Sequence, residues 1–314
     1  MSRRKSTKFN YSKQFDQLFA QGYEQLSLDD HLESLRAKGL QYRTKLTKSG
    51  NMLEVEIYPI NPVWKLQKGQ KRAKVTTSRE EQARLNLDNT RKRVSRLVHA
   101  NFTRRDIWVT FNYGHMHMPK DIAEASRHLK NYFDRLKRHI KKHNLLELKY
   151  IYVTERVENE KTGKVHTHHH IIMNFQDRDT AEALWTLGGR TQSRRLQPDQ
   201  DGSLGGLARY ISKPETKEGN RKGAKTYATS KNLKKPEVRT ADNKLPGTNY
   251  RLSKKRVAEM VADESKIADV LTNNYSGFIL TQLPKAKLSE YTAGAYIYAR
   301  LMKAPIRSRK EVDT

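Results

Sequence analysis

The sequence predicts an α+β fold, with a central antiparallel β-sheet flanked by helices. Between residues 106 and 236 the hydrophobic pattern runs from a strand to a long helix, then to a pair of strands, then to two shorter helices. The paired strands are separated by a polar segment containing Gly163, as in a hairpin. An antiparallel sheet with helices on its faces accommodates this order of elements.

The elements of this region follow from their periodicity. Residues 106–112 alternate two sets of side chains with the period of a strand. Apolar residues at steps of three and four after Pro119 predict a long amphipathic helix. The full set is strands over 106–112, 148–155 and 168–175, and helices over 122–140, 180–187 and 204–213.

The flanking sequences carry weaker patterns. We therefore divide the chain into a basic N-terminal accessory region (1–104), an α+β domain (105–236) and a C-terminal accessory region (237–314). Residues 52–58 alternate and predict a half-buried strand. The remaining predictions are a helix after Ser78 with Ala83, Leu87, Val94 and Leu97 in one apolar stripe, a basic loop over 209–256, a helix through Val257–Leu271, and a short strand at Ile279–Leu280.

The charge of the chain favours a nucleic-acid partner. Lys and Arg number 62 against 34 Asp and Glu, which gives a formal net charge of +28. Such a charge disfavours compaction unless a polyanion shares it, so DNA or RNA is the leading partner. An anionic membrane surface is the weaker alternative, because no amphipathic anchor is evident.

The composition also excludes several classes of site. The chain has no cysteine, which excludes disulfides, thiolate zinc sites and thiol nucleophiles. No apolar run reaches the length of a membrane span, and the basic residues after Met1 are not followed by the apolar segment of a secretory signal. We therefore expect a cytoplasmic protein that handles nucleic acid.

A histidine cluster occupies the second strand of the predicted hairpin. Side chains alternate faces along a strand, so His166, His168 and His170 share one face and His169 lies on the other. Two imidazoles at alternate positions can direct their nitrogens at one ion, and the apolar residues that follow hold the strand in a sheet. A single strand histidine is usually structural, but this pattern predicts a metal site.

A third ligand is expected from the neighbouring strand. If the hairpin is centred near residues 161–162, Glu155 lies opposite His168, because the indices of antiparallel partners sum to a constant. A carboxylate with two neutral imidazoles suits a divalent metal such as Mg²⁺ or Mn²⁺, with open positions for water and phosphate oxygen. Glu158 and His166 are the alternatives to Glu155.

A tyrosine and a lysine share one face of the predicted helix over 204–213. Tyr210 and Lys213 are three residues apart, so they are neighbours on a helix surface. A tyrosine hydroxyl can attack phosphorus once a cation polarises the phosphate, and its ordinary pKa of about 10 means that it needs this help. We expect Lys213 to offset negative charge, and the nearby basic residues to bind DNA: Arg209, Lys231, Lys234 and Lys235.

Together these residues resemble the HUH endonuclease superfamily, in particular its single-tyrosine rolling-circle replication initiators of small phages and plasmids. The family's first motif, an apolar strand rich in threonine and aromatic residues, is similar to residues 108–113. The second, His-hydrophobic-His followed by apolar residues, is similar to residues 168–173, with His169 in the usually hydrophobic middle position. The third, Tyr-x-x-Lys, is similar to residues 210–213, and the resemblance covers about residues 105–236.

The resemblance implies an enzyme that nicks single-stranded or hairpin DNA at a replication origin. Tyr210 would become linked to the 5′ phosphate, and the freed 3′-OH would prime rolling-circle synthesis before the strand is rejoined. His168 and His170 would bind Mg²⁺ or Mn²⁺ with Glu155, and Lys213 would position the phosphate or the metal. The sequence contains no Gly-x₄-Gly-Lys phosphate-binding loop, so unwinding and synthesis would depend on a separate host helicase and DNA polymerase.

Other functions share some of these features. A relaxase or a single-strand transposase has the same metal face and a tyrosine, but relaxases tend to place the tyrosine ahead of the histidines, whereas Tyr210 follows them. A non-catalytic nucleic-acid-binding protein would use the histidines and the tyrosine for stacking and phosphate contact, without a divalent metal. We expect a nicking initiator that acts in the cytoplasm of a bacterial host.

Overall fold

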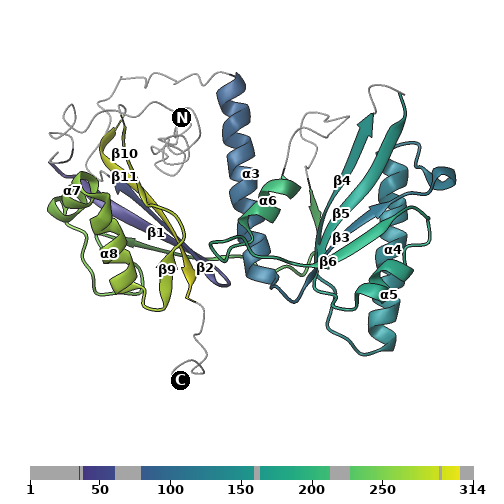
Figure 1. Cartoon of the computed structure of the whole chain (residues 1–314). Coiled ribbons are helices and arrows are strands. Elements are labelled where there is room, and N and C mark those ends of the chain that lie inside the picture. The colour runs from purple at the N-terminus through teal and green to yellow at the C-terminus, as the bar shows by residue number, and fades with distance from the viewer. Residues whose placement is uncertain are drawn as a thin grey trace, which may run out of the picture. The chain divides into compact units, whose positions relative to one another are not determined.

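Two antiparallel sheets organise the chain (Figure 1). The computed structural model describes residues 35, 38–60, 79–158, 163–212, 227–289 and 292–304. One compact unit is formed by Thr90–Lys235, and the other combines the described parts of Met1–Asn89 and Pro236–Thr314. The mixed α+β class with antiparallel sheets and flanking helices is confirmed, with one sheet in each unit.

The sheet of unit Thr90–Lys235 has five strands in the order β6-β3-β5-β4-β7, and all neighbours run antiparallel. The first predicted strand and the predicted hairpin are its three central strands. β6 was not expected, because its sequence Thr-Gln-Ser-Arg-Arg has no apolar face. The strands are β3 (Ile107–Asn112), β4 (Tyr150–Glu158), β5 (Val165–Met173), β6 (Thr191–Arg195) and β7 (Ala228–Thr229).

Helices cover both faces of this five-stranded sheet. α4 (Ile122–Lys142) begins at Asp121, whose side chain accepts the backbone N–H of Glu124, and it packs its apolar face on one side together with α5 (Arg178–Ala183). The second half of α3 (Arg79–Asn101) and α6 (Gly205–Ile211) pack on the other side. Among the described residues, no helix has both the length and the apolar character needed to cross a membrane.

The apolar stripe predicted for α3 is partly wrong. Val94 is fully buried as expected, but its buried neighbour one turn on is Val98, and Ala83 is exposed. The boundary between the compact units falls within this helix, at residues 89 and 90, so its two halves do not serve a single core. A stripe drawn along the whole helix therefore fits only the second half.

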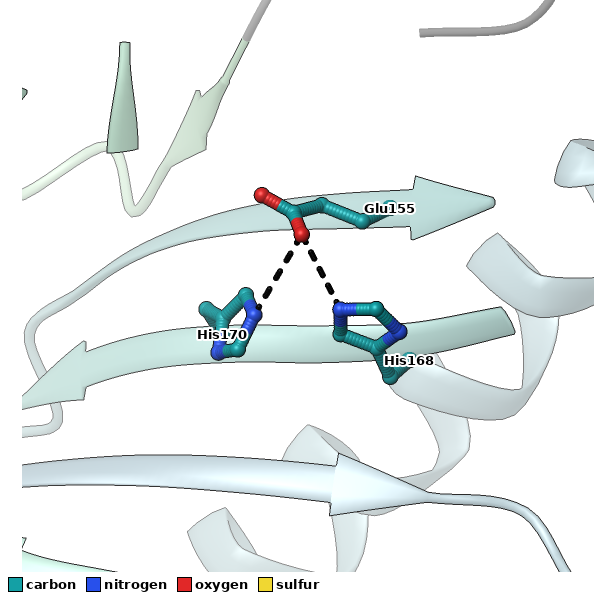
Figure 2. A group of neighbouring side chains, drawn as sticks. All are labelled: Glu155, His168 and His170. Carbon is teal, nitrogen blue, oxygen red and sulfur yellow. Dashed lines mark hydrogen bonds and ion pairs between the residues drawn. The ribbon is translucent and has the colours of Figure 1, made fainter. Parts of the chain in front are cut away.

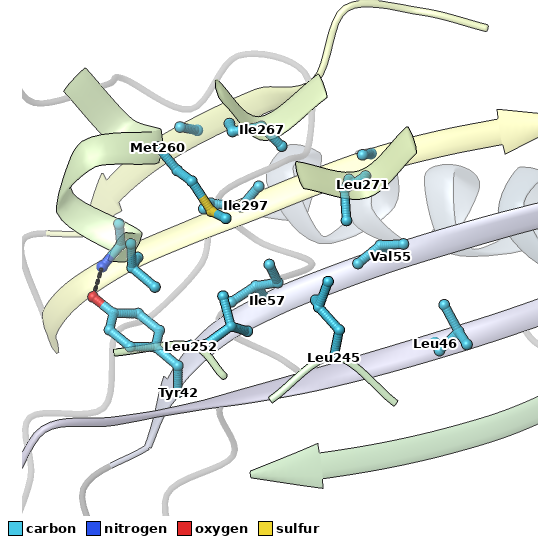
Figure 3. Packing of buried hydrophobic residues seen from close by; sticks show 14 of the residues in the cluster. Tyr42, Leu46, Val55, Ile57, Leu245, Leu252, Met260, Ile267, Leu271 and Ile297 are labelled. Carbon is cyan, nitrogen blue, oxygen red and sulfur yellow. Dashed lines mark hydrogen bonds between the residues drawn. The ribbon is translucent and has the colours of Figure 1, made fainter. Parts of the chain in front are cut away.

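The other unit has a six-stranded sheet in the order β10-β11-β2-β1-β8, with β9 also paired to β11. α7 (Lys254–Ala262) and α8 (Glu264–Asn274) pack apolar side chains such as Met260 and Leu271 on one face of this sheet (Figure 3). The strands are β1 (Gln41–Ser49), β2 (Met52–Ile60), β8 (Glu237–Asp242), β9 (Phe278–Leu280), β10 (Lys285–Ser289) and β11 (Thr292–Lys303).

The two flanking regions, which the sequence analysis kept apart, therefore contribute to one sheet. β2 from the N-terminal region lies between β1 and β11, and its Val55 pairs with Ala299. The prediction that residues 52–58 form a half-buried strand is wrong, because β2 is buried along its whole length. On the second face Glu54 accepts hydrogen bonds from Tyr298 and Arg300, which allows the carboxylate to be buried.

Two further predictions for the C-terminal region are corrected. Residues 209–256 are not a continuous loop, because β7 and β8 lie within them; their exposed polar sequences gave no strand pattern. The single helix through Val257–Leu271 is two helices, because Asp263 is extended and its side chain accepts the backbone N–H of Ser265 at the start of α8. An aspartate that caps the second helix thus interrupts an otherwise helical spacing.

Candidate metal centre and tyrosine

Glu155, His168 and His170 converge on one face of the five-stranded sheet (Figure 2). β4 pairs with β5 in the register that the sequence predicted, with Glu155 opposite His168. The Glu155 Oε2 atom lies 3.0 Å from Nε2 of His168 and 3.5 Å from Nε2 of His170. One ligand atom from each residue fits within 4.8 Å of the others. The structure therefore brings the three predicted metal ligands together.

The electrostatics of this group suit a divalent ion. Burial by itself raises the pKa of Glu155, but hydrogen bonds and positive charge from His168 and His170 outweigh it and hold that pKa far below its ordinary value. Glu155 is buried, whereas the side chain of His168 is 22% exposed. One carboxylate and two imidazole nitrogens fit an ion such as Mg²⁺ or Mn²⁺, and the exposed side leaves room for water and phosphate oxygens.

The predicted nucleophile lies against the same group. The Tyr210 hydroxyl is 3.0 Å from Nε2 of His170, the nitrogen that also faces Glu155. Burial and the charge of Glu155 raise the pKa of Tyr210, and the charge of Arg194 opposes that shift. The hydroxyl is therefore protonated at neutral pH and lies where a cation bound by the group would lower the cost of losing its proton.

Two contacts fix the start of α6, the helix that carries Tyr210. Nε2 of His99 accepts the Leu204 backbone N–H at 2.9 Å, while its Nδ1 lies 2.7 Å from the Ser95 carbonyl oxygen. The Asp199 carboxylate accepts the Gly206 backbone N–H at 2.6 Å. A Cβ at Gly206 would lie 2.6 Å from Asp199 Oδ1, so only glycine permits this close approach.

Thr110 and Trp108 on β3 support His170 from behind. Nδ1 of His170 lies 3.0 Å from the Thr110 hydroxyl oxygen, which accepts the indole N–H of Trp108 at 3.2 Å. The Trp108 ring stacks on His170 with centroids 5.2 Å apart and meets Tyr210 edge-on at 5.4 Å. When Nε2 gives its lone pair to a metal, Nδ1 carries the proton and donates it to Thr110.

The sequence analysis missed this support, although it quoted both residues in the first motif. The signal was the alternation of 106–112, which puts Trp108 and Thr110 on one face of a strand. What the alternation did not reveal is the partner of that strand. β3 pairs with β5, so that Thr110 lies opposite His170.

His169 lies on the opposite face of β5 and is fully buried. Its Nε2 is 2.8 Å from the Tyr113 hydroxyl and its Nδ1 is 2.8 Å from the Thr154 hydroxyl. Burial, followed by the charges of neighbouring histidines, lowers the pKa of His169 to about 3. A neutral imidazole with both nitrogens hydrogen-bonded thus occupies the middle position of the His-x-His motif and holds β5 against β3 and β4.

The predicted DNA-binding residues do not all lie near this group. Arg209 is exposed on α6 beside Tyr210. The predicted basic run follows β7, where the Ser230 backbone N–H donates to the Tyr150 carbonyl at the start of β4. From Tyr150 to Glu155 the strand extends roughly 17 Å. The exposed lysines of this run, which the structure does not bring to the metal group, are Lys231, Lys234 and Lys235. Lys213 lies outside the described residues.

A comparison with protein families bears on the segment that carries this site. Residues 106–215 match the family model of the replication-associated protein ORF2. No curated protein and no solved structure matches the chain. The matched residues include Glu155, His168, His170 and Tyr210, so the segment that holds the metal group and the tyrosine is similar to replication-associated proteins.

Proposed function

We propose that this protein is a replication initiator that nicks single-stranded or hairpin DNA at an origin by transesterification onto Tyr210. The observation that carries the proposal is the 3.0 Å contact between the Tyr210 hydroxyl and His170, within a group that can hold a divalent ion. The family match to replication-associated proteins supports the biological setting. The nicking activity is assigned to the domain 105–236.

The proposed reaction exchanges one ester for another. A Mg²⁺ or Mn²⁺ ion held by Glu155, His168 and His170 would polarise the scissile phosphate and favour the ionised tyrosine. The Tyr210 oxygen loses its proton and forms a bond to phosphorus, while the bond from phosphorus to the 3′ oxygen breaks and that oxygen takes up a proton. The products are a 5′-phosphotyrosine and a free 3′-OH. The number of phosphate esters is unchanged, so a 3′-OH can reverse the step and rejoin DNA without ATP.

The proposal extends to partners and location. The 3′-OH would be extended by a host DNA polymerase, and a separate host helicase would unwind the duplex in the bacterial cytoplasm. Lys213, three residues after Tyr210, is proposed to offset charge on the phosphate. Arg209, exposed beside the tyrosine, is proposed to contact DNA.

The metal assignment is tested by nicking of end-labelled single strands tiled across the DNA that encodes the protein. His168→Ala and His170→Ala should abolish cleavage and leave DNA binding intact, because they remove metal ligands without removing a fixed positive charge. Glu155→Gln should do the same. His166→Ala, on the same strand but exposed and outside the three-residue group, is the matched control and should still cleave. Cleavage by both His168→Ala and His170→Ala would refute the metal assignment.

A further inference from the structure

We propose that the DNA strand next to Tyr210 lies across β6, with its phosphates bound by Arg190 and Arg194 and its sugars or bases by Gln192. This surface was not among the basic residues that the sequence singled out. The inference rests on the proposed function for the identity of its partner. It adds the route by which the strand reaches the tyrosine.

The alternation of β6 places these three side chains on one face. Ser193 is buried, and its hydroxyl donates to Glu182 of α5, so the odd-numbered residues point toward that helix. Arg190, Gln192 and Arg194 are all exposed. The Gln192 amide is satisfied when its oxygen faces Arg190, at 3.0 Å from both Nε and Nη2. The edge of the sheet therefore presents a row of polar and cationic groups.

The strand register puts this row beside the metal group. Arg194 pairs with Trp108, and Gln192 pairs with Thr110. Directly opposed residues have Cβ atoms about 5 Å apart. Trp108 in turn contacts Tyr210, and the Thr110 hydroxyl is 3.0 Å from His170. The β6 side chains thus lie one strand away from the side chains that touch the tyrosine and the metal ligand.

The chemistry of the row fits a phosphate backbone. A guanidinium offers a planar fork of donors that matches phosphate oxygens, and alternate residues on a strand are separated by about 6.6 Å, so the arginines can contact separate phosphates. The Gln192 amide offers both a donor and an acceptor to a sugar or base edge. With a net charge of +28 and a tyrosine directed at phosphorus, a single strand of DNA is the partner that this surface fits.

The test measures binding without cleavage. Fluorescence anisotropy of a labelled oligothymidylate is followed against salt concentration, in EDTA, with the full chain carrying Tyr210→Phe. Adding Arg190→Gln and Arg194→Gln should weaken binding about tenfold and reduce the salt slope by about 1.4, since each phosphate contact on a single strand contributes about 0.7. Arg195→Gln is the matched control: it is an adjacent, exposed arginine on the opposite face, bonded to the Arg105 carbonyl.

The outcomes separate this surface from the proposed nicking activity. The expected result is a lower salt slope for the double variant and an unchanged slope for Arg195→Gln, with equal thermal midpoints to show that both fold. An unchanged slope for the double variant, or an equal loss in Arg195→Gln, would overturn the β6 route even if the protein nicks DNA. Because metal and nucleophile are absent from the assay, failure of nicking would leave a positive binding result intact.

Discussion

At the scale of single residues, Thr110 is the side chain that orients a metal ligand without being one. It holds the Nδ1 side of His170 at 3.0 Å, so Nε2 is presented to Glu155 and Tyr210. Thr110→Val keeps the shape and removes the hydroxyl, and should weaken Mn²⁺ binding about tenfold or more, as loss of a supporting hydrogen bond does elsewhere. Isothermal titration calorimetry measures this affinity. Thr110→Ser should bind almost normally, and equal affinity of Thr110→Val and wild type would contradict the role.

His169 gives a residue-scale prediction for stability. His169→Leu would leave the buried Tyr113 hydroxyl and the Thr154 hydroxyl without their imidazole partner, at about 1–3 kcal/mol each. Removing the orphaned hydroxyl with Tyr113→Phe in the same chain should recover part of the loss. Urea unfolding followed by tryptophan fluorescence is suitable, because Trp185 lies 5.8 Å from the His169 ring. Strictly additive losses would show that the network does not act as a unit.

At the scale of elements, α6 matters because its start sets the place of Tyr210. Gly206→Ala would bring a Cβ to 2.6 Å from Asp199 Oδ1, so the carboxylate and the first turn must move apart. A displacement of about 1 Å at the reacting atoms can slow catalysis about a hundredfold. We expect Gly206→Ala to slow single-turnover nicking strongly while Mn²⁺ affinity is unchanged. An equal loss of metal affinity would mean that the helix supports the metal group and not only the tyrosine.

The same scale shows what the sequence could and could not predict. The β4–β5 register was predictable, because alternation and a polar turn fix which residues of a hairpin face one another. The pairing of β3 with β5 was not, since no local pattern records which distant strand Trp108 and Thr110 join. β6 was missed for a different reason. Its strand conformation depends on pairing with β3, while its own residues carry no apolar face.

At the scale of the whole molecule, the N-terminal and C-terminal parts of the chain depend on each other. β11 lies between β10 and β2 and buries Ile297, Ala299 and Leu301 in the core of the six-stranded sheet. Deleting residues 292–314 should therefore expose this unit to limited proteolysis. Mn²⁺ binding should persist, because all three ligands lie in the unit Thr90–Lys235. Loss of metal binding on this truncation would show that the unit does not hold its site alone.

The central claim is that Tyr210 becomes covalently linked to DNA with the help of a divalent metal. The direct measurement incubates the protein with end-labelled single strands tiled across its own replicon, with Mn²⁺ or with EDTA, and resolves the products on a denaturing gel. We expect a protein–DNA adduct that requires Mn²⁺ and is absent from Tyr210→Phe. An adduct that survives in Tyr210→Phe would transfer the nucleophile to another residue, and tight binding without any adduct would contradict the nicking mechanism.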